Sequence, residues 1–294
     1  MEKLVVEQNN IRIDKYLSEK LNISRASVQK LIDNEKIKVN DKFIKSSHSL
    51  NENDIISYTL KLDICTDILP ENIKLDIIYE DEYLLVVNKP NNMIVHPANN
   101  VYSNTLVNAL MYHSNLSNNG YRPGIVHRID KKTTGLLLVA KNDIVHEKLS
   151  KMIKEKQVIR KYLVLVKGSI NHELGTIDAP IGRDIIDRKK MSVTSLNSKK
   201  AITHFKVLKR FDNATLVECK LDTGRTHQIR VHFKYINHPI INDNVYNNKV
   251  LNDFGQMLHS KFISFNHPIT DKFLEFEVDA PKEFYDILKL YEEV

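Results

Sequence analysis

The sequence predicts an α+β protein with a small N-terminal unit, in which two helices pack on a small sheet, and a larger domain built on a second sheet. Apolar residues recur at helical spacing in some segments and alternate or run together as in strands in others. A polar stretch over 61–72, which contains Pro70, separates the two parts. With 294 residues the chain can form both cores, and we place the units at 11–60 and 73–294, with 61–72 as the linker.

The small unit begins with a helical pattern. Apolar side chains recur every fourth residue over 13–21, and Ser24 stands where it could cap a second helix whose apolar positions fall in 28–32. Residues 36–39 then alternate as a strand, and a further short strand is predicted near 54–56. Two helices on a small sheet follow from this order.

The larger domain alternates between the two kinds of pattern. Strand patterns cover 83–87, 136–140, 162–166, 200–205 and 215–221. Helical patterns cover 106–111, 146–155, 226–236 and 283–290. Thr226 is a possible cap of the third of these helices, with Ile229, Phe233 and Ile236 facing the core.

Positive charge is concentrated in one part of the chain. The whole chain carries a formal net charge of +6, but residues 121–235 contain 25 Lys and Arg against 11 Asp and Glu. A basic segment of this size suits a protein that binds a polyphosphate backbone. Nucleic acid is therefore the first partner to consider.

Other classes of protein are disfavoured by composition. No apolar run approaches the roughly 20 residues that cross a bilayer, and the first residues lack a signal-peptide pattern, so we expect a cytoplasmic protein without a membrane partner. The two cysteines are far apart, and His227 and His232 are five residues apart instead of four, so no metal site is predicted.

The segment 124–142 places Asp130 on a loop between a basic stretch and the apolar run 136–140. Two parts of this segment, His127-Arg128-Ile129-Asp130 and Thr133 to Lys141, closely resemble the motif that carries the catalytic aspartate in the RluA-type family of pseudouridine synthases. The resemblance implies an isomerase that converts uridine to pseudouridine in RNA. It also implies a catalytic domain with a mixed, largely antiparallel sheet flanked by helices, and no cofactor.

Two further segments resemble motifs of the same family. The family's tyrosine motif is matched at Tyr162, and its arginine motif is matched at 221–233, where Arg225 is expected to pair with the catalytic carboxylate Asp130. The predicted catalytic residues are thus Asp130, Tyr162 and Arg225. The predicted substrate-binding residues are His127, Arg128, Thr134, Arg183 and Ile229.

The N-terminal unit resembles the S4 RNA-binding domain in several short segments, among them Ser24-Arg25, 28–32, Ile37 to Asn40 and Asp54 to Ile56. The resemblance implies phosphate contacts that position RNA without reading its sequence. The candidate contact residues are Arg12, Arg25, Lys30, Lys36 and Lys38.

The predicted activity is therefore isomerisation of uridines in structured RNA, by a monomer. Within the family, the two-domain arrangement favours large-subunit ribosomal RNA, with transfer RNA as the alternative. A non-catalytic RNA-binding protein of ribosome assembly is a further alternative of a different class. The carboxylate could act by covalent attack or by removing a sugar proton, and the sequence does not choose between these roles.

Overall fold

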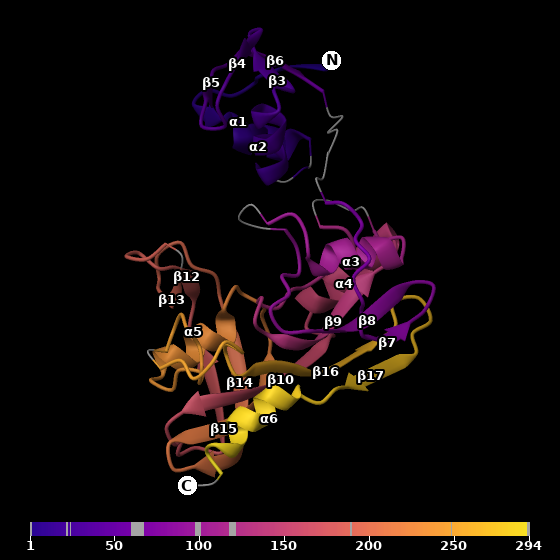
Figure 1. Ribbon diagram of the computed structural model, residues 1–294. Helices are drawn as coiled ribbons and strands as arrows, with labels where there is room; N and C mark the ends of the chain where they lie inside the picture. The colour runs from indigo at the N-terminus through magenta and orange to yellow at the C-terminus, as the bar shows by residue number, and fades with distance from the viewer. Residues whose placement is uncertain are drawn as a thin grey trace. The chain divides into compact units, whose positions relative to one another are not determined.

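The computed structural model describes residues 2–21, 23, 25–59, 68–97, 101–117, 122–188, 190–247 and 249–292, without the side chains of 26, 27 and 30. The chain divides into two compact units, Met1–Asp67 and Ile68–Val294 (Figure 1). Ser24, predicted to cap the second helix, lies outside the described residues.

The small unit contains the two expected helices, α1 (Ile13–Lys20) and α2 (Arg25–Asp33). Its larger sheet has the order β1 (Glu2–Val5), β6 (Ile55–Tyr58), β3 (Ile37–Val39) and β4 (Lys42–Phe43), and β2 (Ile11–Arg12) pairs with β5 (Ser49–Leu50). Asn40 and Asp41 have φ angles of 48° and 61°, the left-handed conformation that a tight turn between β3 and β4 requires. The helices pack on the sheet through one apolar cluster.

The large unit is organised around a nine-stranded sheet. Its order is β11 (Leu174–Asp178), β14 (Ile202–Phe211), β15 (Ala214–Leu221), β10 (Ile159–Lys167), β16 (Leu258–Asn266), β9 (Thr134–Ala140), β8 (Leu84–Lys89) and β7 (Ile77–Glu80), and β17 (Phe273–Glu277) also pairs with β16. β9 and β16 run parallel, whereas the other neighbouring strands in the described sheet run antiparallel. The predicted mixed, largely antiparallel sheet is confirmed.

Helices cover both faces of the sheet, which explains the uninterrupted apolar runs 84–87 of β8 and 136–140 of β9. α3 (Leu106–His113) packs with Leu85 and Leu137, and α4 (Asp143–Lys154) packs with the alternate residues Leu84 and Leu136. Successive side chains of a strand point to opposite faces, so the two helices lie on opposite sides of β8 and β9.

Two further helices and a hairpin complete the large unit. α5 (Gln228–Tyr235) and α6 (Lys282–Lys289) contribute Phe233 and Phe284 to the cluster that contains α3. β12 (Ile181–Arg183) and β13 (Met191–Val193) form a separate two-stranded hairpin beside the sheet (Figure 1). None of the helices in the described ranges is long and apolar enough to span a membrane.

Gly135 allows β9 to approach β16. Its φ is 106°, and a Cβ atom at this position would lie 2.2 Å from the backbone oxygen of Ser260, with which Gly135 is in register. Asn92 and Asn242 also adopt left-handed conformations, with φ of 62° and 59°, as Asn tolerates better than most residues. The close approach of β9 and β16 fixes the end of β9 that follows Asp130.

Candidate active site

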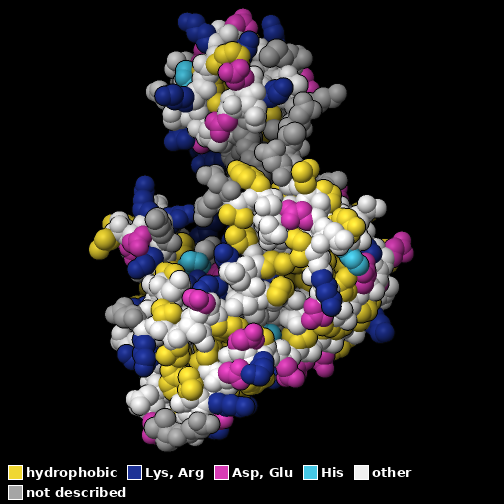
Figure 2. Space-filling view, viewed as in Figure 1, with side chains coloured by type: hydrophobic (Ala, Val, Ile, Leu, Met, Phe, Trp, Pro, Cys, Tyr) yellow, Lys and Arg dark blue, Asp and Glu magenta, His cyan; other side chains and the backbone are white. Residues whose placement is uncertain are grey.

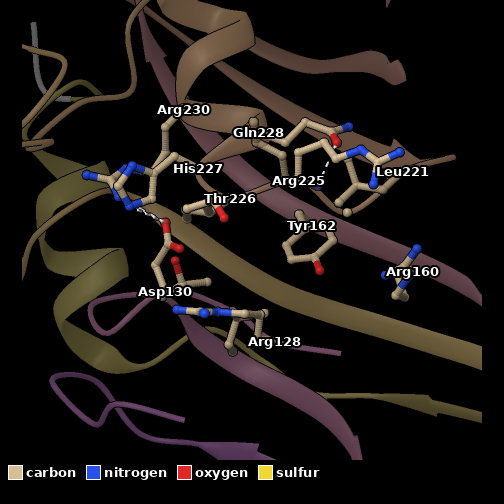
Figure 3. A pocket seen from close by; sticks show the side chains of 15 residues that line it. Arg128, Asp130, Arg160, Tyr162, Leu221, Arg225, Thr226, His227, Gln228 and Arg230 are labelled. Carbon is tan, nitrogen blue, oxygen red and sulfur yellow. Dashed lines mark hydrogen bonds and ion pairs between the residues drawn. The ribbon is translucent and has the colours of Figure 1, made fainter. Parts of the chain in front are cut away.

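A pocket opens beside Asp130, next to β10, β16 and the start of α5 (Figure 3). It is lined by Arg128, Ile129, Asp130, Thr133, Arg160, Tyr162, Leu221, Gly224, Arg225, Thr226, His227, Gln228, Ile229, Arg230 and Leu258. The three sequence segments selected above thus meet in one place, although they are separated by about 30 and 95 residues along the chain.

Asp130 lies on the loop that leads into β9, and its side chain is 20% exposed. Its Oδ2 accepts a hydrogen bond from Nη1 of Arg230 at 2.9 Å. A second group, Nε2 of His227, lies 4.0 Å from the same oxygen. The carboxylate is therefore oriented by a cation and remains open to the pocket.

Arg230 is itself held by a second carboxylate. Its Nε and Nη2 donate to the two oxygens of Asp243 at 2.7 and 2.8 Å, a bidentate pair in which both side chains are buried. Burial opposes the charge of Arg230, but the hydrogen bonds and charges of Asp243 and Asp130 outweigh burial and raise its pKa. The guanidinium is thus a fixed cation between two carboxylates.

The expected ion pair between Asp130 and Arg225 is wrong, because Arg230 makes it instead. Arg225 lines the pocket, but its Nε donates to the backbone oxygen of Lys200 at 3.0 Å, and in Figure 3 its side chain extends away from Asp130.

The start of α5 explains which of the two arginines faces the acid. The N-cap of the helix is His227, in a left-handed conformation with φ of 57°, so the predicted cap Thr226 precedes the helix start. The side chain of Gln228 instead accepts from the amide of Arg225 and from the hydroxyl of Thr223. Arg225 therefore lies on the loop before α5, while Arg230 is in the first turn of α5.

Tyr162 lies on β10 with 4% of its surface exposed, opposite Ser260 of β16 in the sheet. In Figure 3 its ring lies in the middle of the pocket, with Asp130 on one side and Arg160 on the other. Burial raises the pKa of the phenol and outweighs the charge of Arg160 and the hydroxyl of Ser260, which lower it. The tyrosine is therefore a neutral hydroxyl at pH 7.

His227 belongs to a hydrogen-bonded relay that sequence reasoning missed. The hydroxyl of Tyr246 accepts from the amide of Met191 at 3.0 Å and lies 2.8 Å from Nδ1 of His227. Burial lowers the pKa of His227, and its other ring nitrogen, Nε2, faces Asp130. Met191 thereby links the β12–β13 hairpin to the site.

Lys89 is a second residue that the sequence did not single out. It is 1% exposed, and its Nζ donates to the backbone oxygens of Pro90, Met93 and Lys131 at 2.8, 2.9 and 3.1 Å. Burial lowers its pKa to about 7, while the charge of Asp130 opposes this change. Since Lys131 follows Asp130 directly, Lys89 fastens the loop that carries Asp130 to the end of β8.

The predicted substrate-binding residues are not all in this pocket. Ile229 is buried in its wall and Arg128 lies exposed on it, whereas His127 and Arg183 line an adjoining hollow. Thr134 is absent from the described lining of both; it is buried with its Oγ1 2.8 Å from Nδ1 of His259.

The side chains predicted to contact RNA in the small unit are exposed or partly buried, where they are described. Arg12 is paired with Asp14 at 3.0 Å, Arg25 is exposed at the start of α2, and Lys36 is half-buried before β3. Lys38 places its Nζ 4.5 Å from the ring centre of Phe43. The side chain of Lys30 lies outside the described residues. In neither unit does the described part of the chain bring three or more metal-ligating side chains together.

Comparison with known proteins matches residues 83–235 to the family described as RNA pseudouridylate synthase and residues 11–56 to the S4 domain. The chain belongs to the RNA pseudouridine synthase family. It is an isomerase that converts uridine to pseudouridine in RNA, and the predicted family and activity are confirmed.

Similar pseudouridine synthases are known from bacteria. The chain is 48% identical to an uncharacterized RNA pseudouridine synthase of Bacillus subtilis, over 96% of this chain and 95% of that protein. It is 43% identical to ribosomal large subunit pseudouridine synthase D of Zymomonas mobilis, over 75% of this chain and 74% of that protein.

A solved structure shows the same fold. The structure of human RNA pseudouridylate synthase domain containing 1 is 28% identical, with a TM-score of 0.59 over 72% of this chain and 85% of that one.

Proposed function

We propose that this enzyme isomerises specific uridines of large-subunit ribosomal RNA and that Asp130 is its catalytic carboxylate. The observation that carries the assignment of Asp130 is its ion pair with the buried Arg230 at 2.9 Å, in a pocket that also holds Tyr162. The choice of ribosomal RNA is supported by several relatives named ribosomal large subunit pseudouridine synthase D, at 37–43% identity.

The reaction breaks the bond between N1 of uracil and C1′ of ribose, turns the base, and joins C5 to C1′. Asp130 initiates cleavage, and the hydrogen bond from Arg230 keeps it aimed at the sugar. After the new bond forms, C5 must lose a proton, and the phenol of Tyr162 in the middle of the pocket is placed to relay it. Ile229 supplies an apolar wall against which the detached uracil is retained.

Substrate access requires the uridine to leave the stacked RNA. Extruding a nucleotide costs a few kcal/mol, which contacts to phosphates offset. Arg128 and Arg183 are exposed beside the site and suit this role. We assign phosphate contacts of the small unit to Arg12, Arg25, Lys30, Lys36 and Lys38. We place the enzyme in the cytoplasm, where ribosomal RNA is available to it, as a monomer.

The test is a map of pseudouridine in total RNA from cells with wild-type protein, with Asp130→Asn, and with the control Asp253→Asn, which changes an exposed carboxylate. We expect Asp130→Asn to abolish the protein-dependent pseudouridines while RNA affinity stays within a few-fold, because the amide cannot act as a base or nucleophile. Asp253→Asn should behave as wild type.

A different result would contradict each part of the proposal. Pseudouridine formation by Asp130→Asn would refute the role of Asp130. If the pseudouridines that require the protein occur only in transfer RNA, the ribosomal substrate is refuted and the transfer RNA alternative is favoured. No protein-dependent site in any RNA would favour a non-catalytic role in ribosome assembly.

A further inference from the structure

A second hollow adjoins the pocket of Asp130. The two cavities share Arg128, Arg160, Gly224, Arg225 and Thr226 as lining residues, so they lie side by side. The second hollow is also lined by Arg122, Lys154, Arg183 and Lys199. Figure 2 shows Lys and Arg side chains around a recess beside the β12–β13 hairpin.

Arg160, at the junction of the two cavities, is a buried cation without a counter-charge. It lies on β10 with only 4% of its surface exposed, and its Nε is buried without a hydrogen-bond partner. Within the described ranges, no acidic side chain forms an ion pair with it. Burying an unpaired charge is costly, so the fold keeps Arg160 here at the expense of stability.

His127 lines the same hollow and also has a buried nitrogen without a hydrogen-bond partner among the described residues. Its Nε2 lies 2.9 Å from the amide nitrogen of Leu138, which donates to it, so Nε2 carries no proton. Burial lowers the pKa of His127 to about 3, and the charge of Arg160 adds to this effect, so the ring is neutral. The proton of a neutral ring is then on Nδ1, which is buried without an acceptor in the part of the chain that the structure describes.

Arg225 is the third residue with hydrogen-bond donors at this hollow. Its Nε donates a hydrogen bond to the backbone oxygen of Lys200. In Figure 3 its guanidinium lies on the same side of Tyr162 as Arg160, away from Asp130. The side chains of Arg160, Arg225 and His127 therefore line one hollow directly beside the pocket of Asp130.

We propose that Arg160, His127 and Arg225 bind one backbone phosphate of the RNA directly beside the reacting uridine. A phosphodiester supplies a negative charge and oxygen acceptors, which match the donors that these residues leave unused. Bound here, the phosphate fixes the sugar of the extruded nucleotide between this hollow and Asp130. The proposal rests on the assignment of the Asp130 pocket as the reaction site.

The experiment uses a short RNA stem-loop that contains a uridine modified only when the protein is present. The uridine can come from ribosomal or transfer RNA. A single neutral methylphosphonate linkage replaces each phosphate around that uridine in turn, and kcat/KM is measured for each RNA. We expect one linkage to lower the wild-type value about 10- to 100-fold, as loss of a charge-assisted contact predicts. Arg160→Gln should lose a similar factor on natural RNA and be insensitive, within about 3-fold, to that linkage.

Lys154→Gln is the matched control, because Lys154 lines the same hollow but lies on its rim. This variant should bind every RNA of the series more weakly by a similar factor. Its kcat/KM should still fall, as for wild type, when the critical phosphate is replaced. The proposal is overturned if no linkage matters to the wild-type enzyme, or if Arg160→Gln remains as sensitive as wild type. Absence of activity on every RNA would instead refute the function proposed above.

A stability measurement separates this role from a structural one. Arg160→Met removes the unpaired buried charge and keeps most of the side-chain volume, so its melting temperature should equal or exceed that of wild type. A melting temperature lowered by several degrees would show that the folded protein itself uses the charge, and would overturn the proposal. The methylphosphonate scan with wild-type enzyme requires no variant and so does not depend on this result.

Discussion

The identity of single residues decides how the carboxylate of Asp130, the proposed catalytic group, is held. Asp130 contacts a guanidinium that is already fixed by both oxygens of Asp243, so the acid meets a cation that cannot rotate away. A side chain with a planar fork is needed for this geometry, because one nitrogen faces Asp130 while two others face Asp243.

Arg230→Lys should therefore retain a positive charge but lose the orientation of Asp130. We expect kcat to fall about 100-fold or more, as misplacement of a reacting group by about 1 Å can cause. Arg225→Lys is the comparison. Its kcat at saturating RNA should stay within a few-fold, because Arg225 does not contact the acid and lysine keeps the positive charge proposed to bind phosphate. Single-turnover rates at saturating RNA distinguish the two variants, and equal kcat losses would contradict this assignment.

The sequence could locate Asp130 and Tyr162 but not the partner of the acid. Arg225 and Arg230 occur five residues apart in one segment, and both were compatible with a role beside Asp130. The choice depends on the left-handed backbone of His227, which delays the start of α5 until Gln228. A left-handed backbone is uncommon for any residue other than glycine, so even histidine, which adopts it more often than most, does not predict it. The long-range partner Asp243 gave no local signal.

Two strands that are distant in the sequence lie side by side in the sheet and so bring these residues into one site. β9 and β16 pair in parallel through Thr134 and Gly135. The apolar runs predicted the individual strands, because burial on both faces leaves a clear composition. Their parallel pairing was not predictable, since it depends on contact between Gly135 and Ser260, which are 125 residues apart.

Gly135→Ala should be severely destabilising. A Cβ atom would lie 2.2 Å from the backbone oxygen of Ser260, and the φ of 106° is unfavourable for alanine, so we expect a loss of about 3 kcal/mol or more in the free energy of unfolding. Gly168→Ala is the matched control, with a φ of 78° but a nearest contact of 3.4 Å, and should cost only about 1 kcal/mol. Urea denaturation measures both, and equal losses would show that backbone conformation alone explains the effect.

At the scale of the whole molecule, chemistry and RNA capture are assigned to separate units. The reaction pocket and its adjoining hollow lie entirely within Ile68–Val294, while the S4 domain lies within Met1–Asp67. Each unit has an apolar cluster of its own. Loss of the small unit should therefore leave the reaction site assembled.

Removal of residues 1–67 should separate affinity from chemistry. We expect the shortened enzyme to modify a minimal stem-loop with kcat within a few-fold of wild type, since every lining residue of the pocket is retained. Its affinity for a large structured fragment of ribosomal RNA should fall at least 10-fold, and the dependence of binding on salt should become shallower, because each lost phosphate contact removes about one unit of slope. Titrations of the two RNAs at several salt concentrations measure both quantities. Unchanged affinity and slope for the large fragment would show that the S4 domain contributes no phosphate contacts, whereas loss of activity on the minimal stem-loop would show that the reaction site depends on it.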